Sequence, residues 1–395
     1  MTLAALCGLT LHPAPIDAAH AVENSSAGEF WREPRVGANL FNRQESAARI
    51  HAAAELGVDF VRLAPDKWRG AGRDFLIGDA DGYTGIPPSD LSELARVLDA
   101  ASTSGVRVVL TMLSLPGARW RQANGGSDDG RLWNAPAFQH QAVAFWTDLV
   151  KAVAGHPAIV GYDLLNEPHP ARTLAGLEVG DPAYGHWWEQ ARGTPADLNQ
   201  FYRRAVAAIR AVDPRTPILI ESAGYAAVGA LDLLEPVDDP AVLYSFHFYE
   251  PWTYTARRVN KGRYTYPDRM PAGSATHTER WERTRIAERL APAVRWASRH
   301  GLPPGRLVLG ELGCSRQVQG VTEYLADVID AADANGWHWA FYAFREDTWS
   351  DMDYELGPAP VPWSVLEPIQ AGTRSRAPFR ENPIFQMLVS KIGAN

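Results

Sequence analysis

The sequence is poor in the residues that form covalent or metal-based cross-links. It has two cysteines in 395 residues, Cys7 and Cys314, so we expect neither a disulfide framework nor a cysteine-rich metal cluster. Its histidines show no spacing typical of metal ligands, and we expect no metal and no cofactor. Stability must therefore come from a core, and 46% hydrophobic residues are ample for one in a chain of this length.

Basic clusters and long apolar runs are also missing. The net charge is −8, and no lysine- or arginine-rich stretch is present to neutralise phosphates, which argues against nucleic acid as a partner. No apolar run approaches the ~18 residues of a membrane span. A serine hydrolase would show a Gly-x-Ser-x-Gly elbow, and the sequence has none. Nothing in the sequence indicates an oligomeric state.

The amino terminus resembles a secretion signal. Residues 3–11 form a short apolar core, and Ala19-His20-Ala21 fits a small-x-small cleavage site. The usual positively charged leader is absent, which is consistent with a truncated or misassigned start, and a loosely docked tail is the alternative. We interpret residues 1–21 as the signal and residues 22–395 as one catalytic domain of a secreted or periplasmic protein.

Apolar runs that read as strands alternate with amphipathic runs that read as helices. The expected strands are Val36–Leu40, Val58–Leu63, Val106–Leu113, Ile159–Leu165, Pro217–Ile220, Val242–Tyr249, Leu307–Leu309 and Trp337–Phe344. The expected helices are Glu45–Leu56, Ser89–Thr103 with Ser89 as N-cap, Phe138–Ala154, Ala196–Val212, Val228–Leu234, Glu279–His300, Val321–Asn335 and Asn382–Ile392.

This alternation predicts an α/β fold of the (β/α)8 TIM barrel type, because each of the eight strand-like runs is followed by a helix-like run. A doubly wound open sheet is less favoured, since no run has the polar character of an edge strand. Two long insertions, Ala171–Thr194 and Pro251–Thr278, follow the fourth and sixth strands. Both contain tryptophan and tyrosine, and loops of this length are often functional.

Two glutamates end strands that should meet at one end of the barrel. The stretch from Ile159 onward is apolar or glycine, except for Asp163, until it breaks into Asn166-Glu167-Pro168, and the seventh strand-like run leads through Gly310 into Glu311. Active sites of such barrels form at the carboxyl ends of the strands. We therefore expect Glu167 and Glu311 to face each other, with Pro168 holding Glu167 in the extended geometry of a strand end.

A pair of carboxyl groups can cleave an acetal, because one donates a proton to the leaving oxygen and the other attacks the anomeric carbon. Other strand ends supply side chains that suit this chemistry. Arg62 would keep Glu311 ionised, and Tyr249 would donate a hydrogen bond to it. His247 shares a face of its strand with Tyr249, and would orient the acid or bind substrate. Asn166 suits a contact with a sugar 2-hydroxyl.

The motifs "LLNEPHP", "HFYEP" and "VLGELG", after "VRL", resemble glycoside hydrolase family 5, the cellulase-like family of the retaining barrel glycosidase clan. The resemblance covers roughly Val36 to Phe344. It implies that Glu167 is the acid/base and Glu311 the nucleophile of a retaining enzyme that cleaves β-glycosidic bonds. It also implies that Arg62, Asn166, His247 and Tyr249 contact the carbohydrate substrate.

The sequence departs from the family pattern at two strand ends. The third strand usually ends with histidine, and Leu113 stands there. The eighth usually carries a tryptophan under the sugar. Here Tyr342 or Phe344 takes that position, with Trp349 as a ring supplied by the loop. The acids of residues 345–357 are expected to bond sugar hydroxyls, which would favour an exo-acting enzyme or a short-oligosaccharide substrate. The sugar, the linkage and endo or exo action stay open.

Several tryptophans fall in predicted loops on the catalytic side, where flat aromatic rings suit the apolar faces of sugars. About half are expected to pack the loops instead; the set is Trp120, Trp133, Trp187, Trp188, Trp252 and Trp349. Trp146, Trp281 and Trp296 are assigned to helices and to packing.

Other readings of the same residues remain. Arg62 alone could serve only as a structural ion-pair partner, and Glu221 is balanced between a supporting role and scaffold. A metal-dependent barrel is disfavoured, since the first strand-like run lacks His-x-His. The alternatives for function are a transglycosylase that uses the same intermediate and a catalytically inactive sugar-binding barrel.

Overall fold

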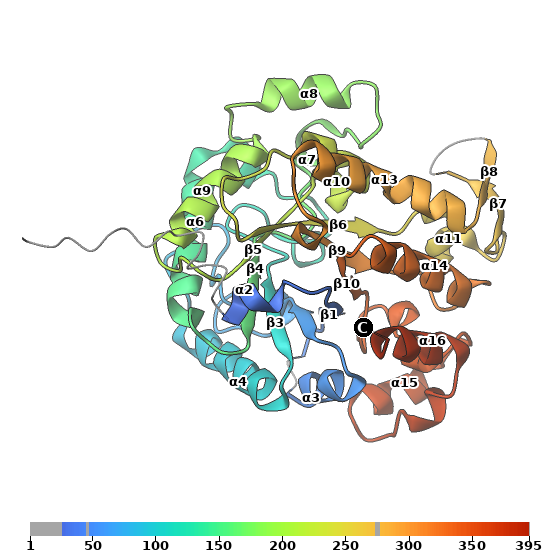
Figure 1. Ribbon diagram of the computed structural model, residues 1–395. Coiled ribbons are helices and arrows are strands. Elements are labelled where there is room, and N and C mark those ends of the chain that lie inside the picture. The colour runs from blue at the N-terminus through green and yellow to red at the C-terminus, as the bar shows by residue number, and fades with distance from the viewer. Residues whose placement is uncertain (1–25, 45–46, 273–276, 395) are drawn as a thin grey trace, which may run out of the picture.

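The computed structural model describes residues 26–44, 47–272 and 277–394, so the expected signal at residues 1–21 lies outside the described part. Eight parallel strands close into a barrel in the order β1-β10-β9-β6-β5-β4-β3-β2 (Figure 1). Their bounds are β1 Val36–Leu40, β2 Phe60–Leu63, β3 Arg107–Thr111, β4 Ile159–Asp163, β5 Ile218–Glu221, β6 Val242–Phe248, β9 Leu307–Leu312 and β10 His338–Phe341. The predicted (β/α)8 barrel is confirmed.

Strand β9 runs three residues further than the sequence pattern predicted, and this brings Glu311 into the sheet. Gly310 interrupts the apolar run, but a side chain there would overlap the Ser245 hydroxyl, so glycine is what lets β9 pass close to β6. The pairing of these two strands shifts between Phe246 and His247, after which His247 pairs with Glu311. The irregularity therefore sets a histidine beside a carboxylate.

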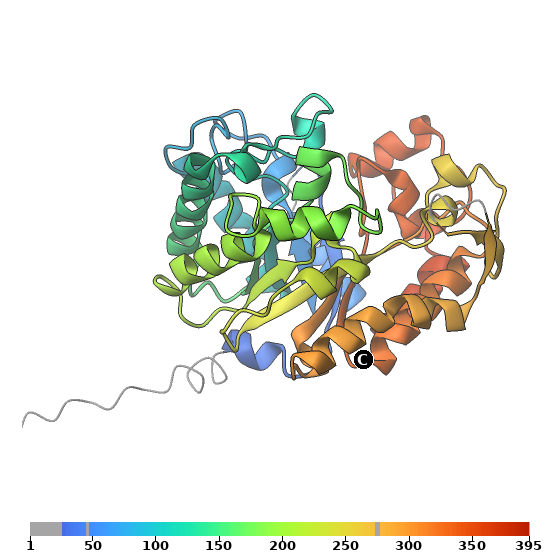
Figure 2. The same ribbon diagram turned by 90° about the horizontal axis from the view of Figure 1, so that it is seen from above.

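The amino-terminal end of the barrel is closed by apolar side chains. Seven strands contribute one inward-facing residue each to this layer, namely Phe60, Val109, Val160, Leu219, Leu243, Val308 and Ala340. On β1 the position belongs to Gly37, where a side chain would overlap the Phe60 ring. Trp31, just after α2 (Ser26–Phe30), packs beneath the layer and donates its indole N–H to the Val160 carbonyl at 2.8 Å. The opposite end is left for the functional loops (Figure 2).

Helices surround the barrel where the amphipathic patterns predicted them. The main ones are α3 Ala47–Leu56, α4 Pro88–Ser104, α6 Pro136–Val153, α9 Leu198–Arg210, α13 Arg283–Arg299, α14 Val321–Ala334 and α16 Pro383–Ile392, with a 3-10 helix at Val228–Leu233. Ser89 is not the N-cap of α4, because the helix begins one residue earlier at Pro88 and Pro87 occupies the cap. Residues Thr278–Trp281 form strand β8 instead of the first turn of α13, so Trp281 is buried in a strand and not in a helix.

The described parts of the two long insertions form short helices and a strand, and they lie with the loops at the carboxyl end. The first holds α7 (Pro170–Ala175) and α8 (Tyr184–Ala191), and the second holds α11 (Trp252–Thr255), α12 (Arg257–Asn260) and β7 (Asp268–Pro271), which pairs antiparallel with β8. After β10 the chain forms α15 (Trp363–Gln370) and then reaches α16 (Figure 1). Within the described ranges, every helix is too short or too polar to cross a membrane.

Candidate active site

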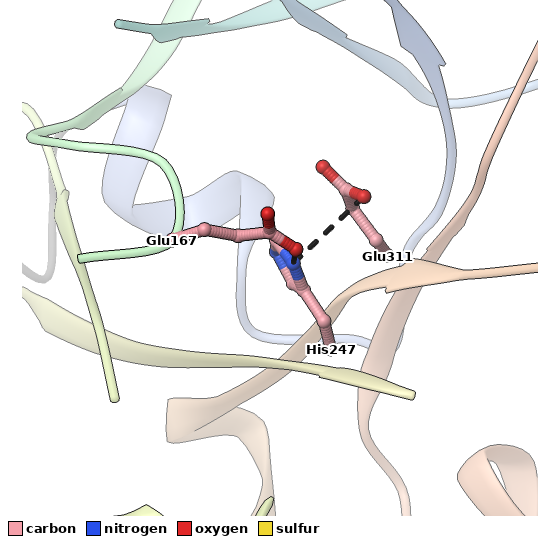
Figure 3. A group of neighbouring side chains, drawn as sticks. All are labelled: Glu167, His247 and Glu311. Carbon is pink, nitrogen blue, oxygen red and sulfur yellow. Dashed lines mark hydrogen bonds and ion pairs between the residues drawn. The ribbon is translucent and has the colours of Figure 1, made fainter. Parts of the chain in front are cut away.

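Glu167 and Glu311 lie together at the carboxyl end of the barrel. Glu167 comes four residues after β4, and Glu311 is on β9. A carboxylate oxygen of each, together with a ring nitrogen of His247, fall within 4.8 Å of one another (Figure 3). Glu311 is 4% exposed, whereas the side chain of Glu167 keeps 29% of its surface open. The two carboxyl groups that the sequence placed on one mouth are therefore neighbours in space.

His247 bridges three carboxyl groups from the floor of this site. Its Nδ1 lies 3.0 Å from Oε1 of Glu167 and 3.8 Å from Oε2 of Glu311. Its Nε2 lies 3.2 Å from Oε1 of Glu221, an ion-pair distance without the alignment of a hydrogen bond. Burial opposes a charge on the ring, but Glu221, Glu311 and Glu167 outweigh it and raise the pKa of His247 to about 10. The imidazole is therefore cationic at neutral pH.

Glu311 is held by two donors on its own side of the site. Arg62 Nη1 donates to Oε1 at 2.7 Å, and the Tyr249 hydroxyl donates to Oε2 at 2.6 Å. Both oxygens of the carboxylate are thus fixed by charge-assisted or hydroxyl hydrogen bonds. Burial, together with the negative charge of Glu311, raises the pKa of Tyr249 well above its ordinary value, so its hydroxyl keeps the proton that it donates.

Arg62 is fully buried, and its guanidinium organises the base of the site. It donates to Asp163 at 2.7 Å, to Glu221 at 2.5 Å and to the Asn166 amide oxygen at 2.8 Å, in addition to Glu311. Burial lowers the pKa of Arg62, but the carboxylates of Asp163, Glu221 and Glu311 raise it further, so the net shift is upward. The hydrogen bond from Arg62 orients the Asn166 side chain, and it engages the amide oxygen of Asn166.

Two members of this network were not found from the sequence. Asn39 on β1 accepts from Arg62 at 3.0 Å and donates to the Gly310 carbonyl at 3.0 Å. Asp163 on β4 pairs with Arg62, and burial raises the pKa of Asp163 to about 7 against the opposing effect of Arg62. Both sit inside apolar strands, and an isolated polar residue in such a run was the available signal. Glu221 supports the site directly, since its Oε2 accepts the Glu167 backbone N–H at 2.6 Å.

Pro168 predicted an extended backbone at Glu167, and this prediction is wrong. Glu167 has φ +54°, in the left-handed region that few non-glycine residues adopt. The bond from its N–H to Glu221 fixes this turn. A strained conformation of this kind persists only where its surroundings enforce it. The prediction considered only the restriction that proline places on the residue before it. It did not include Glu221, whose carboxylate accepts the Glu167 N–H.

Burial raises the pKa of Glu167 above its ordinary value. The negative charge of Glu311 acts in the same direction, whereas the hydrogen bond with His247 opposes it. In the same network the pKa of Glu221 is lowered, because His247 and Arg62 overcome the effect of burial. The site therefore moves the pKa of Glu167 and that of Glu221 in opposite directions, and such a separation is what acid–base chemistry requires.

Glu167, His247 and Glu311 have a spacing that could hold a metal ion. The charge state of the histidine works against this, because a ring with a pKa raised to about 10 must first lose a proton to become a ligand. Arg62 already occupies one oxygen of Glu311. The donor set is therefore suited to proton transfer rather than to a metal centre.

The wall next to Glu311 is an apolar cluster rich in aromatic rings, and Leu113 is part of this cluster. Leu113 packs in an apolar cluster with Phe41, Ala64, Tyr342, Ala343 and Met352, against which Trp120 and Tyr249 also lie. Tyr342 donates its hydroxyl to Glu346 at 2.9 Å, and its ring centroid is 6.3 Å from that of Trp349, which is 49% exposed. Phe344 is buried in the main core instead. Of the two candidates after β10, Tyr342 is the one beside the site.

The other tryptophans divide between packing and exposure. Trp133 and Trp188 are buried, whereas Trp252 is 46% exposed on the sixth-strand loop. Trp146 and Trp296 are buried and donate to backbone carbonyls at 3.0 Å each, as expected for packing residues.

The acids of residues 345–357 are mostly held by arginines and not free for sugar hydroxyls. Glu355 is 1% exposed and pairs with Arg345, Arg376 and Arg380, and Asp353 pairs with Arg376 at 2.6 Å. These bonds tie the segment after β10 to the stretch before α16. The expectation that this whole segment binds sugar is wrong for these two acids, since sequence spacing did not reveal the distant arginines.

Comparison with known proteins supports the fold that carries this site. A family model described as cellulase (glycosyl hydrolase family 5) matches residues 23–348. Endoglucanase C of Acetivibrio thermocellus is 26% identical over 212 residues, 53% of this chain and 52% of the relative, so the chain spans about half the length of this curated relative. Cellodextrinase A of Ruminococcus flavefaciens is 23% identical over 291 residues, 73% of this chain and 71% of the relative. The endoglucanase structure from Thermotoga maritima matches with a TM-score of 0.60 at 16% identity, over 86% of this chain and 94% of that one, which supports the fold.

Proposed function

The chain belongs to glycosyl hydrolase family 5, a family of O-glycoside hydrolases, and on that premise we propose that it cleaves β-glycosidic bonds of a glycan or oligosaccharide with retention. The observation that carries the proposal is the approach of Glu167 and Glu311 to within 4.8 Å. Retaining glycosidases place their carboxyl groups about 5 Å apart, whereas inverting enzymes leave room for a water at about 6.5–9.5 Å.

In this proposal Glu311 is the nucleophile. Arg62 and Tyr249 fix its two oxygens, so the carboxylate meets the anomeric carbon in one orientation. Alignment of this kind lowers the barrier, because the geometry of attack is set before the reaction begins. Attack forms a bond between a Glu311 oxygen and the anomeric carbon while the bond to the leaving oxygen breaks.

Glu167 is the acid and then the base. The proton on its carboxyl group passes to the leaving oxygen in the first step. In the second, Glu167 removes a proton from water, the water oxygen bonds to the anomeric carbon, and the bond between that carbon and Glu311 breaks. Its raised pKa favours the protonated form that the first step needs. His247 touches the same carboxyl group and positions it.

The remaining predicted residues are assigned to carbohydrate binding. Asn166 lies next to the acid, with its oxygen held by Arg62, so its amide N–H group is left to meet a sugar hydroxyl. Tyr342 and Trp349 offer aromatic surface on the Glu311 side. We further propose that residues 22–395 act as one domain, that residues 1–21 direct secretion or periplasmic export, and that catalysis needs no metal or cofactor.

A screen with aryl β-glycosides and polysaccharides, read by chromatography of the products, tests the activity and identifies the sugar. A 2-fluoro sugar with a good leaving group should then leave a covalent adduct, located by mass spectrometry of peptides. Label on Glu311 supports the proposal, and label elsewhere overturns the nucleophile assignment. Binding without turnover would identify a sugar-binding barrel, and longer products would identify a transglycosylase.

Glu167→Ala tests the acid. Aryl glycosides with very good leaving groups need little protonation, so they should lose much less activity than substrates with poor leaving groups. An equal loss for both would remove Glu167 from the role of acid.

A further inference from the structure

Lys67 is a lysine near the active site whose ammonium has no partner among the described carboxylates. It ends a 3-10 helix, Pro65–Lys67, which follows β2 directly at the carboxyl end of the barrel. The Nζ atom lies 4.7 Å from the centroid of the Trp120 ring, over its face. Neither an ion pair nor a side-chain hydrogen bond of Lys67 is found in the part of the chain that the structure describes.

The surroundings of this ammonium are partly desolvated. Burial lowers the pKa of Lys67, while the negative charges of Glu346, Asp347 and Glu311 raise it less strongly. An ammonium carries three donors and no acceptor. Removing such a group from water without a hydrogen-bond acceptor is unfavourable, so the position is suited to a ligand that brings acceptors with it.

Trp120 holds Lys67 in place. The indole packs on the apolar cluster around Leu113 and Tyr342, and its backbone N–H donates to the Ser114 hydroxyl at 2.8 Å. The neighbouring residue Asp66 accepts the backbone N–H groups of Leu113 and Ser114 at 3.1 and 2.8 Å. These contacts connect the loops after β2 and β3, and together they hold the backbone at Lys67 in place.

The packing around Lys67 indicates on which side of the scissile bond it stands. Trp120, over whose ring the ammonium lies, packs against the same apolar cluster as Tyr249, and the Tyr249 hydroxyl donates to Glu311. In the proposed mechanism Glu167 serves the leaving oxygen, so the leaving group lies on its side. Lys67 therefore belongs with the sugar that is attacked and with the units beyond it, on the glycone side.

Lys67 is not paired with either glutamate of the proposed mechanism, unlike the groups that surround the reacting sugar. Arg62, Tyr249 and His247 contact Glu311 or Glu167 directly, whereas Lys67 forms no ion pair with either. The carboxylates that act on its charge most are those of Glu346 and Asp347 in the segment after β10, where Glu346 accepts the Tyr342 hydroxyl. Since carboxylates dominate this neighbourhood, a neutral sugar suits it better than an acidic one.

We infer that Lys67, positioned by Trp120, is a substrate-binding residue that donates hydrogen bonds to the neutral sugar one unit beyond the reacting one on the glycone side. The inference rests on the proposed hydrolysis. If Lys67 has this role, the enzyme favours substrates with at least two glycone units. The second unit accepts hydrogen bonds from the Lys67 ammonium, which otherwise contacts only the face of the Trp120 indole.

The test compares Lys67→Met with the wild type on 4-nitrophenyl β-glycosides of one and two sugar units in the gluco, manno and xylo series. The series used is the one that the wild type turns over fastest. Methionine keeps the apolar stem and removes the donors. We expect kcat/KM for the two-unit substrate to fall about 10- to 100-fold, as loss of a charged hydrogen bond predicts, with less than about 3-fold change for the one-unit substrate. Equal losses, or no loss, would overturn the inference.

Three further variants separate binding from folding. Lys67→Arg keeps a cation with donors on the ring and should restore most of the selective loss. Trp120→Ala should reproduce it, and the double variant should lose little more than Lys67→Met alone, because both act through one contact. Lys151→Met removes a lysine whose side chain is 60% exposed on α6 and should change neither substrate. Additive losses in the double variant would remove the positioning role of Trp120.

Failure of the inference and failure of the proposed function give different results. A wild type that turns over no glycoside and forms no adduct with the fluorinated sugar contradicts the hydrolysis itself. An active wild type whose selectivity for two units survives Lys67→Met contradicts only the assignment of Lys67.

Discussion

Nε2 of His247 lies 3.2 Å from Oε1 of Glu221 at the base of the barrel mouth. Glu221 is completely buried and also faces Arg62, so the histidine and the arginine share one negative group. The remaining ring nitrogen of His247 is directed to Glu167. A change in the charge of the His247 ring therefore affects both the free energy of unfolding and Glu167, the acid of the proposed mechanism.

The charge on His247 predicts a pH dependence of stability. Its pKa in the folded protein, about 10, lies above the ordinary value of 6.5. The stabilisation is therefore complete below pH 6.5 and is lost as the pH rises through 10. Between pH 6.5 and 9.5 the free energy of unfolding of the wild type should fall more than that of His247→Asn, by up to about 1.4 kcal/mol per pH unit, measured by urea denaturation.

A second buried histidine provides the control. Burial lowers the pKa of His338 from 6.5 to about 4, so its effect on stability lies mainly between these two pH values and fades within the first unit of this interval. His338→Asn should keep the slope of the wild type between pH 6.5 and 9.5, whatever its absolute stability. Equal slopes for the wild type and His247→Asn would show that His247 is neutral in the folded protein.

The parts of the site that could be read from the sequence are those placed by strand ends. Glu167 and Glu311 follow apolar runs, and a closed parallel barrel brings all such ends to one side. His247 and Tyr249 shared a face by the two-residue period of a strand. These inferences need only the local pattern and the fold class, and both were available without coordinates.

Features that depend on contacts between distant strands were not accessible in the same way. The sequence shows Asp163 and Asn39 as polar breaks in apolar strands, but only the register of the barrel reveals that both meet Arg62. The left-handed turn at Glu167 depends on Glu221, 54 residues further along the chain. Likewise, Glu355 was expected to face sugar because the arginines that surround it are remote in sequence, apart from Arg345.

Arg62→Lys should destabilise the fold by about 3 kcal/mol. Lysine has fewer donors and lacks the planar fork, so at least one of the buried groups Asp163, Glu221 and Glu311 loses its partner, and a buried unpaired carboxylate is expensive. Arg73→Lys is the matched control, because Arg73 also pairs with three carboxylates, those of Asp74, Asp79 and Asp81, but its side chain is 41% exposed. Exposed pairs contribute little, so this variant should stay within about 0.5 kcal/mol in chemical denaturation. Similar losses for both would contradict the importance of burial.

Tyr249→Phe should lower kcat/KM about 10- to 100-fold with little effect on the fold. The substitution removes the hydroxyl that donates to Oε2 of Glu311 at 2.6 Å, and a hydrogen bond to a charged group contributes about 1.5–3 kcal/mol. Tyr254→Phe is the comparison, since its hydroxyl donates to the Gln319 carbonyl outside the site. Steady-state kinetics with an aryl glycoside should show the loss for Tyr249 alone, and an unchanged Tyr249→Phe would mean that Arg62 suffices to hold Glu311.

Glu355→Gln distinguishes a structural carboxylate from a sugar ligand. Glu355 is buried and pairs with Arg345, Arg376 and Arg380, which join the segment after β10 to the stretch before α16. Removing its charge leaves these guanidinium groups short of an acceptor, so the free energy of unfolding should fall by about 3 kcal/mol. Because none of these arginines contacts Glu167 or Glu311, kcat/KM of the folded variant should change less than about 3-fold.

The control for this prediction is Glu235→Gln. Glu235 pairs with two arginines, Arg192 and Arg203, but is 41% exposed, so water replaces the lost interactions and stability should change by less than about 0.5 kcal/mol. If Glu355→Gln instead kept its stability and lost activity, Glu355 would have to meet the substrate, as its position beside Trp349 had first suggested. The two outcomes differ because a buried charge that only holds the chain together affects unfolding, whereas one that binds sugar affects turnover.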